Sequence, residues 1–201
     1  MWTRRQRQMC IRDSLEIMIR FTPGIECHTH EYIRTGSFDS KFGFGIEYLN
    51  TLFQRISNTK HLKLNGLHAH IGSQIFELDP HKDLGEIMVS VILDAKKYGH
   101  YIEKLNVGGG LGIKYVEDDD PPSIDEWVRT ISTSVLKACN KHNLDLPTLM
   151  CEPGRSIVST AGITIYKIGA FKEIPGLRTY LSVDGGMSDN PRPITYQSNY
   201  S

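Results

Sequence analysis

The chain has 201 residues, enough to bury the core of one domain, or of one domain and part of another. Its 23 basic and 23 acidic side chains balance, and 39% of its residues are hydrophobic, which is typical of a globular protein and lacks the positive excess of a general nucleic-acid binder. The balanced charge makes nucleic acid an unexpected partner. No apolar run approaches the roughly 20 residues that cross a bilayer, so we do not expect a membrane partner either.

The four cysteines are scattered through the chain and form no Cys-x-x-Cys pair. Their spacing predicts neither a zinc knuckle nor a disulfide framework and favours reduced thiols, so we expect a cytoplasmic protein. Residues 1–14 are basic and have neither a hydrophobic period nor the apolar centre of a secretory signal. We expect a disordered leader there, in preference to an amphipathic targeting segment.

Strands and helices are predicted to alternate from residue 15 onward. Strand-like runs begin at residues 15, 61, 101 and 146. Helical stripes of apolar residues lie between them, at 44–57, 84–99 and 123–139, and the last opens with the capping-box pair Ser123 and Glu126. This alternation predicts a parallel sheet, either doubly wound or closed as a (β/α)8 barrel, of which four β units are half.

After Arg155 the pattern changes to β-rich segments with no intervening helix, divided at Pro175 and Gly176. We therefore place a domain boundary near residue 156. Residues 15–156 are expected to form part of a barrel, and residues 157–201 the start of an all-β domain.

The candidate ligand site follows from the parallel sheet, because ligands bind where parallel strands end at their carboxyl edge. Three strands end in residues that carry binding chemistry. These are His68, His70 and Ser73, then Gly108, Gly109 and Gly110, then Glu152, Gly154 and Arg155.

The glycine triplet would let backbone N–H groups approach an anion, and Arg155 would bind phosphate or carboxylate through paired hydrogen bonds. Taken singly, such a triplet is more often a flexible loop, and Glu152 with Arg155 could be a simple ion pair. A carboxylate can also keep a heterocyclic nitrogen protonated while an imidazole packs on the ring. A phosphate cradle, an imidazole and such a carboxylate together suggest pyridoxal phosphate.

The pair His68 and His70 would point to the same side of a strand, as two zinc ligands do. Zinc needs a third ligand of comparable quality, and no spacing in the chain marks one. We therefore favour a cofactor platform over a metal site, and assign no role to His68.

Several motifs then resemble, in order, those of the diaminopimelate decarboxylases: "THEYIRTG" with "SKFGF", "GLHAHIGSQIF", "LNVGGGLGIKY", "EPGRSIV" and "VDGGMSDNPRPITY". These are fold-type III pyridoxal-phosphate enzymes with an alanine-racemase-like barrel. The resemblance covers residues 15–201 and implies an α/β fold, the second half of a (β/α)8 barrel followed by the start of an all-β domain. It also implies decarboxylation of meso-diaminopimelate to L-lysine, a small-molecule amino-acid substrate and a homodimer.

The resemblance implies roles for individual residues. His70 would stack on the cofactor ring and Glu152 would pair with the pyridine nitrogen, as the catalytic residues. Ser73 and Gly108, Gly109 and Gly110 would help to hold the phosphate. Arg155 would lie at the phosphate and substrate end, and Arg192 and Tyr196 of "RPITY" would contact a carboxylate of substrate or product.

Two parts of the family pattern are not found in the sequence. One is the first-strand motif with the lysine that holds the cofactor, and the other is a later Cys-Glu-Ser motif that completes the partner subunit's site. Lys41 matches a position midway through the barrel and is rejected as that lysine. We therefore expect an internal fragment that is inactive alone.

Other functions remain open at this point. The runner-up is a decarboxylase of arginine, ornithine or a carboxylated polyamine, although "GLHAHIGSQ" with "RPITY" favours diaminopimelate. A catalytically silent relative that binds another protein is a second alternative. A metal-dependent hydrolase on a barrel is a third, and metal analysis of the purified protein would separate it.

Overall fold

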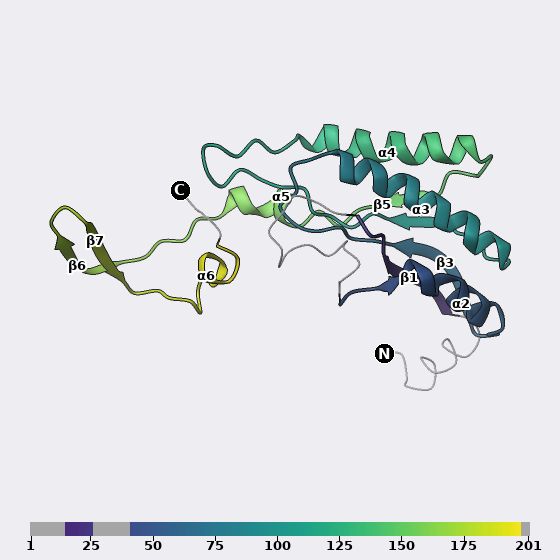
Figure 1. The fold of residues 1–201 in the computed structure, drawn as a ribbon, viewed down its shortest axis with the longest axis horizontal. Helices are drawn as coiled ribbons and strands as arrows, with labels where there is room; N and C mark the ends of the chain where they lie inside the picture. The colour runs from purple at the N-terminus through teal and green to yellow at the C-terminus, as the bar shows by residue number, and fades with distance from the viewer. Residues whose placement is uncertain (1–14, 26–40, 198–201) are drawn as a thin grey trace, which may run out of the picture.

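The computed structural model describes residues 15–25 and 41–197 (Figure 1). The predicted leader at 1–14 and the motif "THEYIRTG" lie outside these residues. No helix of the described part is long and apolar enough to cross a membrane.

Five parallel strands form the main sheet, in the order β2-β1-β3-β4-β5. Their bounds are β1 Leu15–Thr22, β2 Phe44–Gly45, β3 Leu62–His68, β4 Lys104–Asn106 and β5 Thr148–Met150. The four predicted strands and their parallel pairing are confirmed. β2 was not predicted, because two residues are too few to show a strand period.

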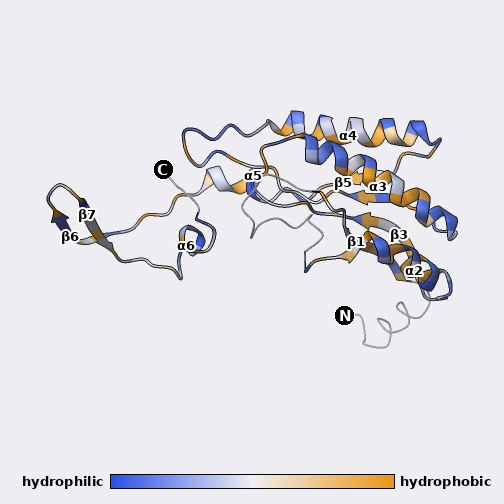
Figure 2. Cartoon of the chain, in the orientation of Figure 1, coloured by the Kyte–Doolittle hydropathy of each residue, from blue (hydrophilic) through white to orange (hydrophobic). Residues whose placement is uncertain are grey.

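Three helices follow strands of this sheet, namely α2 Ile46–Ser57, α3 Asp79–Lys97 and α4 Ile124–Lys141. Figure 1 shows α3 and α4 running side by side along the sheet, and Figure 2 shows hydrophobic residues on the side of α4 that faces α3. The predicted capping box is confirmed, since Ser123 Oγ accepts the Glu126 N–H and Glu126 Oε2 accepts the Ser123 N–H. α3 begins five residues before the predicted start, at Asp79, where Pro80 and an acidic first turn favour a helix start.

The core lies between these helices and one face of the sheet. Leu64 and Leu67 of β3 both belong to it, although three residues apart on a strand they would normally face opposite sides. A register shift between β1 and β3 explains this, because Ile17 pairs with Leu64 and the next residue pairs with Gly66, which leaves Asn65 as an extra residue. The bulge places Asn65 and His68 together on the face opposite the core.

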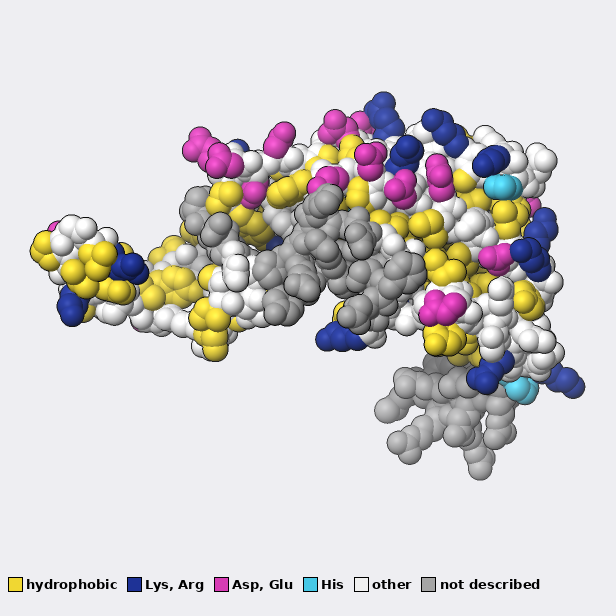
Figure 3. All heavy atoms as spheres, viewed as in Figure 1, with side chains coloured by type: hydrophobic (Ala, Val, Ile, Leu, Met, Phe, Trp, Pro, Cys, Tyr) yellow, Lys and Arg dark blue, Asp and Glu magenta, His cyan; other side chains and the backbone are white. Residues whose placement is uncertain are grey.

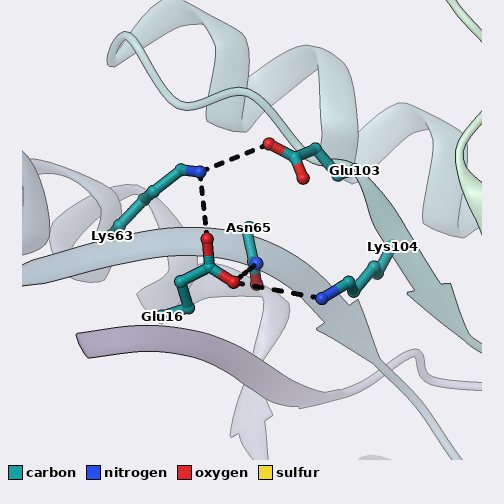
Figure 4. A network of polar contacts seen from close by, with 5 residues as sticks. All are labelled: Glu16, Lys63, Asn65, Glu103 and Lys104. Carbon is teal, nitrogen blue, oxygen red and sulfur yellow. Dashed lines mark hydrogen bonds and ion pairs between the residues drawn. The ribbon is translucent and has the colours of Figure 1, made fainter. Parts of the chain in front are cut away.

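A network of polar side chains joins β1, β3 and β4 near the amino ends of these strands (Figure 4). Lys63 Nζ lies 3.1 Å from Glu16 Oε1 and 3.4 Å from Glu103 Oε1, while Asn65 Nδ2 donates to Glu16 Oε2 at 2.6 Å. Lys104 Nζ lies 4.0 Å from that same oxygen. The hydrogen bond from Lys63 lowers the pKa of Glu16, and the same bond raises the pKa of Lys63. The exposed ion pairs are screened by water and contribute little to stability.

The chain after β5 leaves the sheet. It forms the short helices α5 Arg155–Val158 and η2 Ser159–Ala161, then an antiparallel hairpin of β6 Ile168–Ile174 and β7 Arg178–Val183, then α6 Arg192–Tyr196. The predicted β-rich segments on either side of Pro175 and Gly176 are confirmed as this hairpin. The short helices were not predicted, because segments of three to five residues show no helical period. The boundary predicted near residue 156 falls inside α5 and stays a prediction.

Candidate cofactor site

Three neighbouring strands bring their carboxyl ends together at one edge of the sheet. Backbone hydrogen bonds continue past the strands, from Ala69 N to Asn106 O at 3.0 Å and from Val107 N to Met150 O at 3.0 Å. Beyond these bonds lies a cavity of about 180 Å³, whose lining includes Arg155 and Ser156 at the start of α5. Seven of the nine predicted strand-end residues line it, namely His70, Ser73, Gly109, Gly110, Glu152, Gly154 and Arg155, whereas His68 and Gly108 do not.

The glycine loop, residues 108–110, is tightly held, whereas an isolated glycine triplet would suggest a flexible loop. Gly108 has φ +70, and a Cβ there would lie 2.6 Å from His70 Nδ1. A Cβ on Gly109 would overlap the carbonyl oxygen of Glu152. Side chains at these two positions would therefore push apart the strand ends that form the cavity.

His70 accepts a hydrogen bond at Nδ1 from the Gly109 N–H, with 3.1 Å between the two nitrogens. A ring nitrogen that accepts carries no proton, so this bond requires a neutral imidazole with its proton on Nε2. Burial of the ring, and then the charge of Arg20, lower the pKa of His70 and favour the same neutral form. His70 thus offers an uncharged, oriented ring at the cavity.

Arg155 is held by neutral partners. Its Nη2 donates to Ser73 Oγ at 2.9 Å and its Nη1 donates to the Tyr115 hydroxyl at 2.6 Å. Its Nε is buried and has no hydrogen-bond partner in the described part of the chain. Across residues 15–25 and 41–197, no carboxylate pairs with this guanidinium. Its positive charge is therefore available to an anion in the cavity.

Glu152 does not form the simple ion pair with Arg155 that their closeness in sequence allowed. Its Oε1 accepts from Asn106 Nδ2 at 2.8 Å and lies 3.4 Å from His68 Nε2. Burial lowers the pKa of His68, while the nearby Glu152 charge opposes this shift. About half of the Glu152 side chain, 52%, stays exposed, so the carboxylate can reach a ligand.

Arg192 and Tyr196 lie elsewhere. Both belong to α6, where the Arg192 guanidinium lies 5.2 Å from the centre of the Tyr196 ring, and neither lines the cavity. The structure therefore keeps this predicted pair together but does not bring it to the strand ends. Lys41 does not line the cavity either, and its Nζ lies over the Phe42 ring.

Sequence reasoning missed three residues of this region, Asn106, Tyr115 and Trp127, and it noted His68 at a strand end without assigning it a role. Asn106 had a usable signal, as a polar residue at a strand end, separated from the glycines only by Val107. Trp127 lines the cavity from α4 but was read only as part of a buried helical stripe. Tyr115 meets Arg155 across 40 residues of sequence, and no local pattern marks such a contact.

Comparisons with known proteins agree with this architecture. Residues 7–159 match the family described as "Pyridoxal-dependent decarboxylase, pyridoxal binding domain". The diaminopimelate decarboxylase of Synechocystis sp. is 58% identical over 186 residues, which cover 92% of this chain and 40% of that protein. The solved diaminopimelate decarboxylase of Helicobacter pylori, complexed with L-lysine, superimposes with a TM-score of 0.84 at 28% identity, covering 97% of this chain and 46% of that one. The corresponding protein of M. jannaschii, also in complex with L-lysine, gives 0.82 at 31% identity, covering 94% and 43%.

The chain belongs to the pyridoxal-dependent decarboxylase family, and its residues 7–159 correspond to the family's pyridoxal-binding domain. It spans about 40% of the length of the Synechocystis relative and 43% of the length of a Bacillus subtilis relative.

Proposed function

We propose that the strand-end cavity binds pyridoxal 5'-phosphate and that the protein decarboxylates meso-diaminopimelate to L-lysine and carbon dioxide. The main support for the proposal is that His70, the glycine loop, Glu152 and Arg155 all lie at one cavity. The identity of 58% to a diaminopimelate decarboxylase and the lysine-bound structures of two relatives support the choice of substrate.

The residues present fit this cofactor. Backbone N–H groups of a loop of glycines, the Ser73 hydroxyl and an arginine that no carboxylate of the described residues pairs with suit a phosphate. A flat neutral imidazole suits one face of an aromatic ring, and an exposed carboxylate suits a protonated ring nitrogen. When bound, pyridoxal phosphate supplies an electron sink for the electron pair that is left as carbon dioxide departs.

Different residues of the chain would then bind the phosphate, keep the ring nitrogen protonated and orient the ring. The glycine loop, Ser73 and Arg155 would anchor the phosphate, so that the ring lies in one place. Glu152 would hold a proton on the ring nitrogen, because an anionic partner favours the charged form of that nitrogen. His70 would limit the tilt of the ring by packing on its face.

For the substrate we propose carboxylate binding by Arg155, Arg192 and Tyr196. The first lines the cavity. The other two lie on α6 and are assigned from their place in "RPITY". A solved arginine decarboxylase from Paramecium bursaria Chlorella virus, with a TM-score of 0.68 at 16% identity, shares the fold alone and does not favour arginine as substrate.

We further propose a homodimer and a cytoplasmic location. The dimer is supported by the family resemblance and by the apolar side chains that the part of the chain after β5 exposes. The location is supported by the scattered spacing of the cysteines and by Cys139 and Cys151, which are free thiols in the described residues.

The test is an assay of the protein at its natural length with pyridoxal phosphate and each of meso-diaminopimelate, arginine and ornithine. We expect lysine and carbon dioxide in equal amounts from diaminopimelate, with kcat/KM at least about 100-fold above either other substrate. Preferred turnover of arginine or ornithine would contradict the substrate. Tight cofactor binding without turnover of any of the three would favour the non-catalytic relative.

A further inference from the structure

Asn106, the last residue of β4, makes two hydrogen bonds of opposite sense. Its Nδ2 donates to Glu152 Oε1 at 2.8 Å, and its Oδ1 accepts from the Gly108 N–H at 3.0 Å. A carboxylate only accepts and a backbone N–H only donates, so these partners fix which way the amide points. The residue is 7% exposed, and a buried amide with both ends paired is held rigidly.

Glu152 is held at one of its two oxygens. Oε1 receives the Asn106 hydrogen bond and lies 3.4 Å from His68 Nε2, whereas Oε2 receives no hydrogen bond from any residue in 15–25 or 41–197. The backbone adds a second link, since the Glu152 N–H donates to the Gly108 carbonyl at 2.7 Å. Asn106 and this backbone bond therefore tie Glu152 and Gly108 into one unit.

We propose that Asn106 is a positioning residue that links the two anchor points of the cofactor. Through Nδ2 it orients Glu152 toward the ring nitrogen, and through Oδ1 it fixes Gly108, the first residue of the phosphate-binding loop. The proposal rests on the function proposed above and assigns a role to a residue outside the predicted cofactor contacts.

The chemistry at position 106 is specific to an amide. Leucine has a similar size but would leave both the Glu152 oxygen and the Gly108 N–H without this partner. Aspartate would still accept from Gly108 but could not donate to Glu152, and its charge would repel the carboxylate. Asparagine alone among these three satisfies both partners.

Asn65 provides a matched control. It is 4% exposed, it lies in β3, and its Nδ2 also donates to a glutamate, Glu16 Oε2, at 2.6 Å. This second asparagine–glutamate pair belongs to the network near the amino ends of the strands and does not line the cavity (Figure 4). Replacing Asn65 thus disturbs the same kind of bond without touching the site.

The test uses the natural-length protein and pyridoxal phosphate labelled with ¹⁵N in its ring. The ¹⁵N NMR signal reports whether the ring nitrogen of the bound cofactor is protonated, and competition by inorganic phosphate reports the phosphate anchor. We expect Asn106→Leu to shift the ring-nitrogen signal toward the unprotonated form and to weaken inorganic phosphate binding about tenfold, the effect of one lost hydrogen bond. Asn106→Asp keeps an acceptor for Gly108 and should leave phosphate binding within about threefold, while Asn65→Leu should change neither signal.

An unchanged ring-nitrogen signal in Asn106→Leu, or an equal shift in Asn65→Leu, would overturn the proposal, because a purely structural role affects both asparagines alike. If Asn106→Leu does not fold, Asn106→Asp carries the test through the phosphate readout, and a loss of tenfold or more there would count against the proposal. Failure of the unchanged protein to bind pyridoxal phosphate at all would contradict the proposed function itself, and this proposal with it.

Discussion

Among the residues of the candidate site, Glu152 is the one whose charge we expect to matter most for turnover. Replacing it with glutamine keeps an oxygen that can accept from Asn106, so cofactor binding should stay nearly unchanged. Turnover should fall by on the order of 100-fold, since a neutral amide cannot hold the ring nitrogen protonated as a carboxylate does. Steady-state kinetics and cofactor titration of the natural-length variant measure both effects.

Glu16→Gln is the control for this change, because Glu16 also accepts a hydrogen bond from an asparagine but lies in the network near the amino ends of the strands. It should keep full turnover. Undiminished decarboxylation by Glu152→Gln would remove the role given to Glu152.

Arg192 is expected to act in substrate binding. Truncation to alanine would remove a charge-assisted contact of roughly 1.5 to 3 kcal/mol and raise KM for diaminopimelate roughly 10- to 100-fold, with kcat little changed. Arg178→Ala is the matched control, as its guanidinium also stacks on a tyrosine, 6.0 Å from the Tyr180 ring centre, but in the β6–β7 hairpin. A normal KM in Arg192→Ala, or an equal rise in both variants, would refute the assignment.

At the scale of elements, the packing of α3 on α4 encloses an unusual buried group, His81. The ring is 1% exposed and lies edge-on to Trp127, with 5.6 Å between ring centres. Burial lowers the pKa of His81 to about 4, from its ordinary value of 6.5. The folded state therefore keeps the ring neutral at pH values where the unfolded chain would protonate it.

This shift predicts a loss of stability in acid. Between pH 6.5 and about 4 the unfolded chain binds a proton that the folded chain excludes, so stability is complete above pH 6.5 and falls as the pH drops. This difference in proton binding lowers the free energy of unfolding by about 2 kcal/mol between pH 8 and pH 5. Urea unfolding at pH 8 and pH 5 measures this drop in the free energy of unfolding. His81→Phe keeps a ring beside Trp127 but cannot bind the proton, so its drop should be smaller than that of the unchanged protein by about 2 kcal/mol.

His61→Gln, at an exposed position, should keep the pH dependence of the unchanged protein and serves as the control. A His81→Phe variant with an unaltered pH dependence would show that His81 is not the group responsible.

The elements with clear periods were predictable, and the short ones were not. Three helices and four strands followed from apolar spacing, from the capping box at Ser123 and from the strand-like runs. β2, α5 and α6 have two to five residues, and their form depends on neighbours distant in sequence. The bulge at Asn65 belongs to the same class, because it is set by pairing with β1. Within the site, the strand ends were predictable because parallel topology gathers them, whereas the Arg155–Tyr115 contact depends on how a loop folds back.

At the scale of the whole molecule, the part of the chain after β5 exposes a run of apolar side chains. Ile163 is 86% exposed, Ile165 81% and Phe171 73%, and Figure 3 shows hydrophobic side chains gathered over the β6–β7 hairpin. Such surfaces in water usually contact another protein surface. We expect the 201-residue polypeptide to self-associate at micromolar concentration in sedimentation velocity experiments.

Replacing Ile163 and Ile165 together with serine should weaken this association about tenfold or more, since each isoleucine carries roughly 1.5 to 3 kcal/mol of burial when fully covered. Tyr48→Ser, which changes an exposed side chain on α2, should leave it unchanged. A monomer at about 100 µM would contradict the expectation.

The ends of β3, β4 and β5 are proposed to form a site for pyridoxal phosphate, and the other proposed residue roles depend on this site. A crystal structure of the natural-length protein grown with pyridoxal phosphate tests it most directly. We predict that the phosphate binds at the glycine loop 108–110 beside Ser73 and Arg155, that the ring lies against His70, and that the ring nitrogen lies at Glu152. Cofactor bound with its phosphate away from the glycine loop, or with its ring nitrogen away from Glu152, would contradict it.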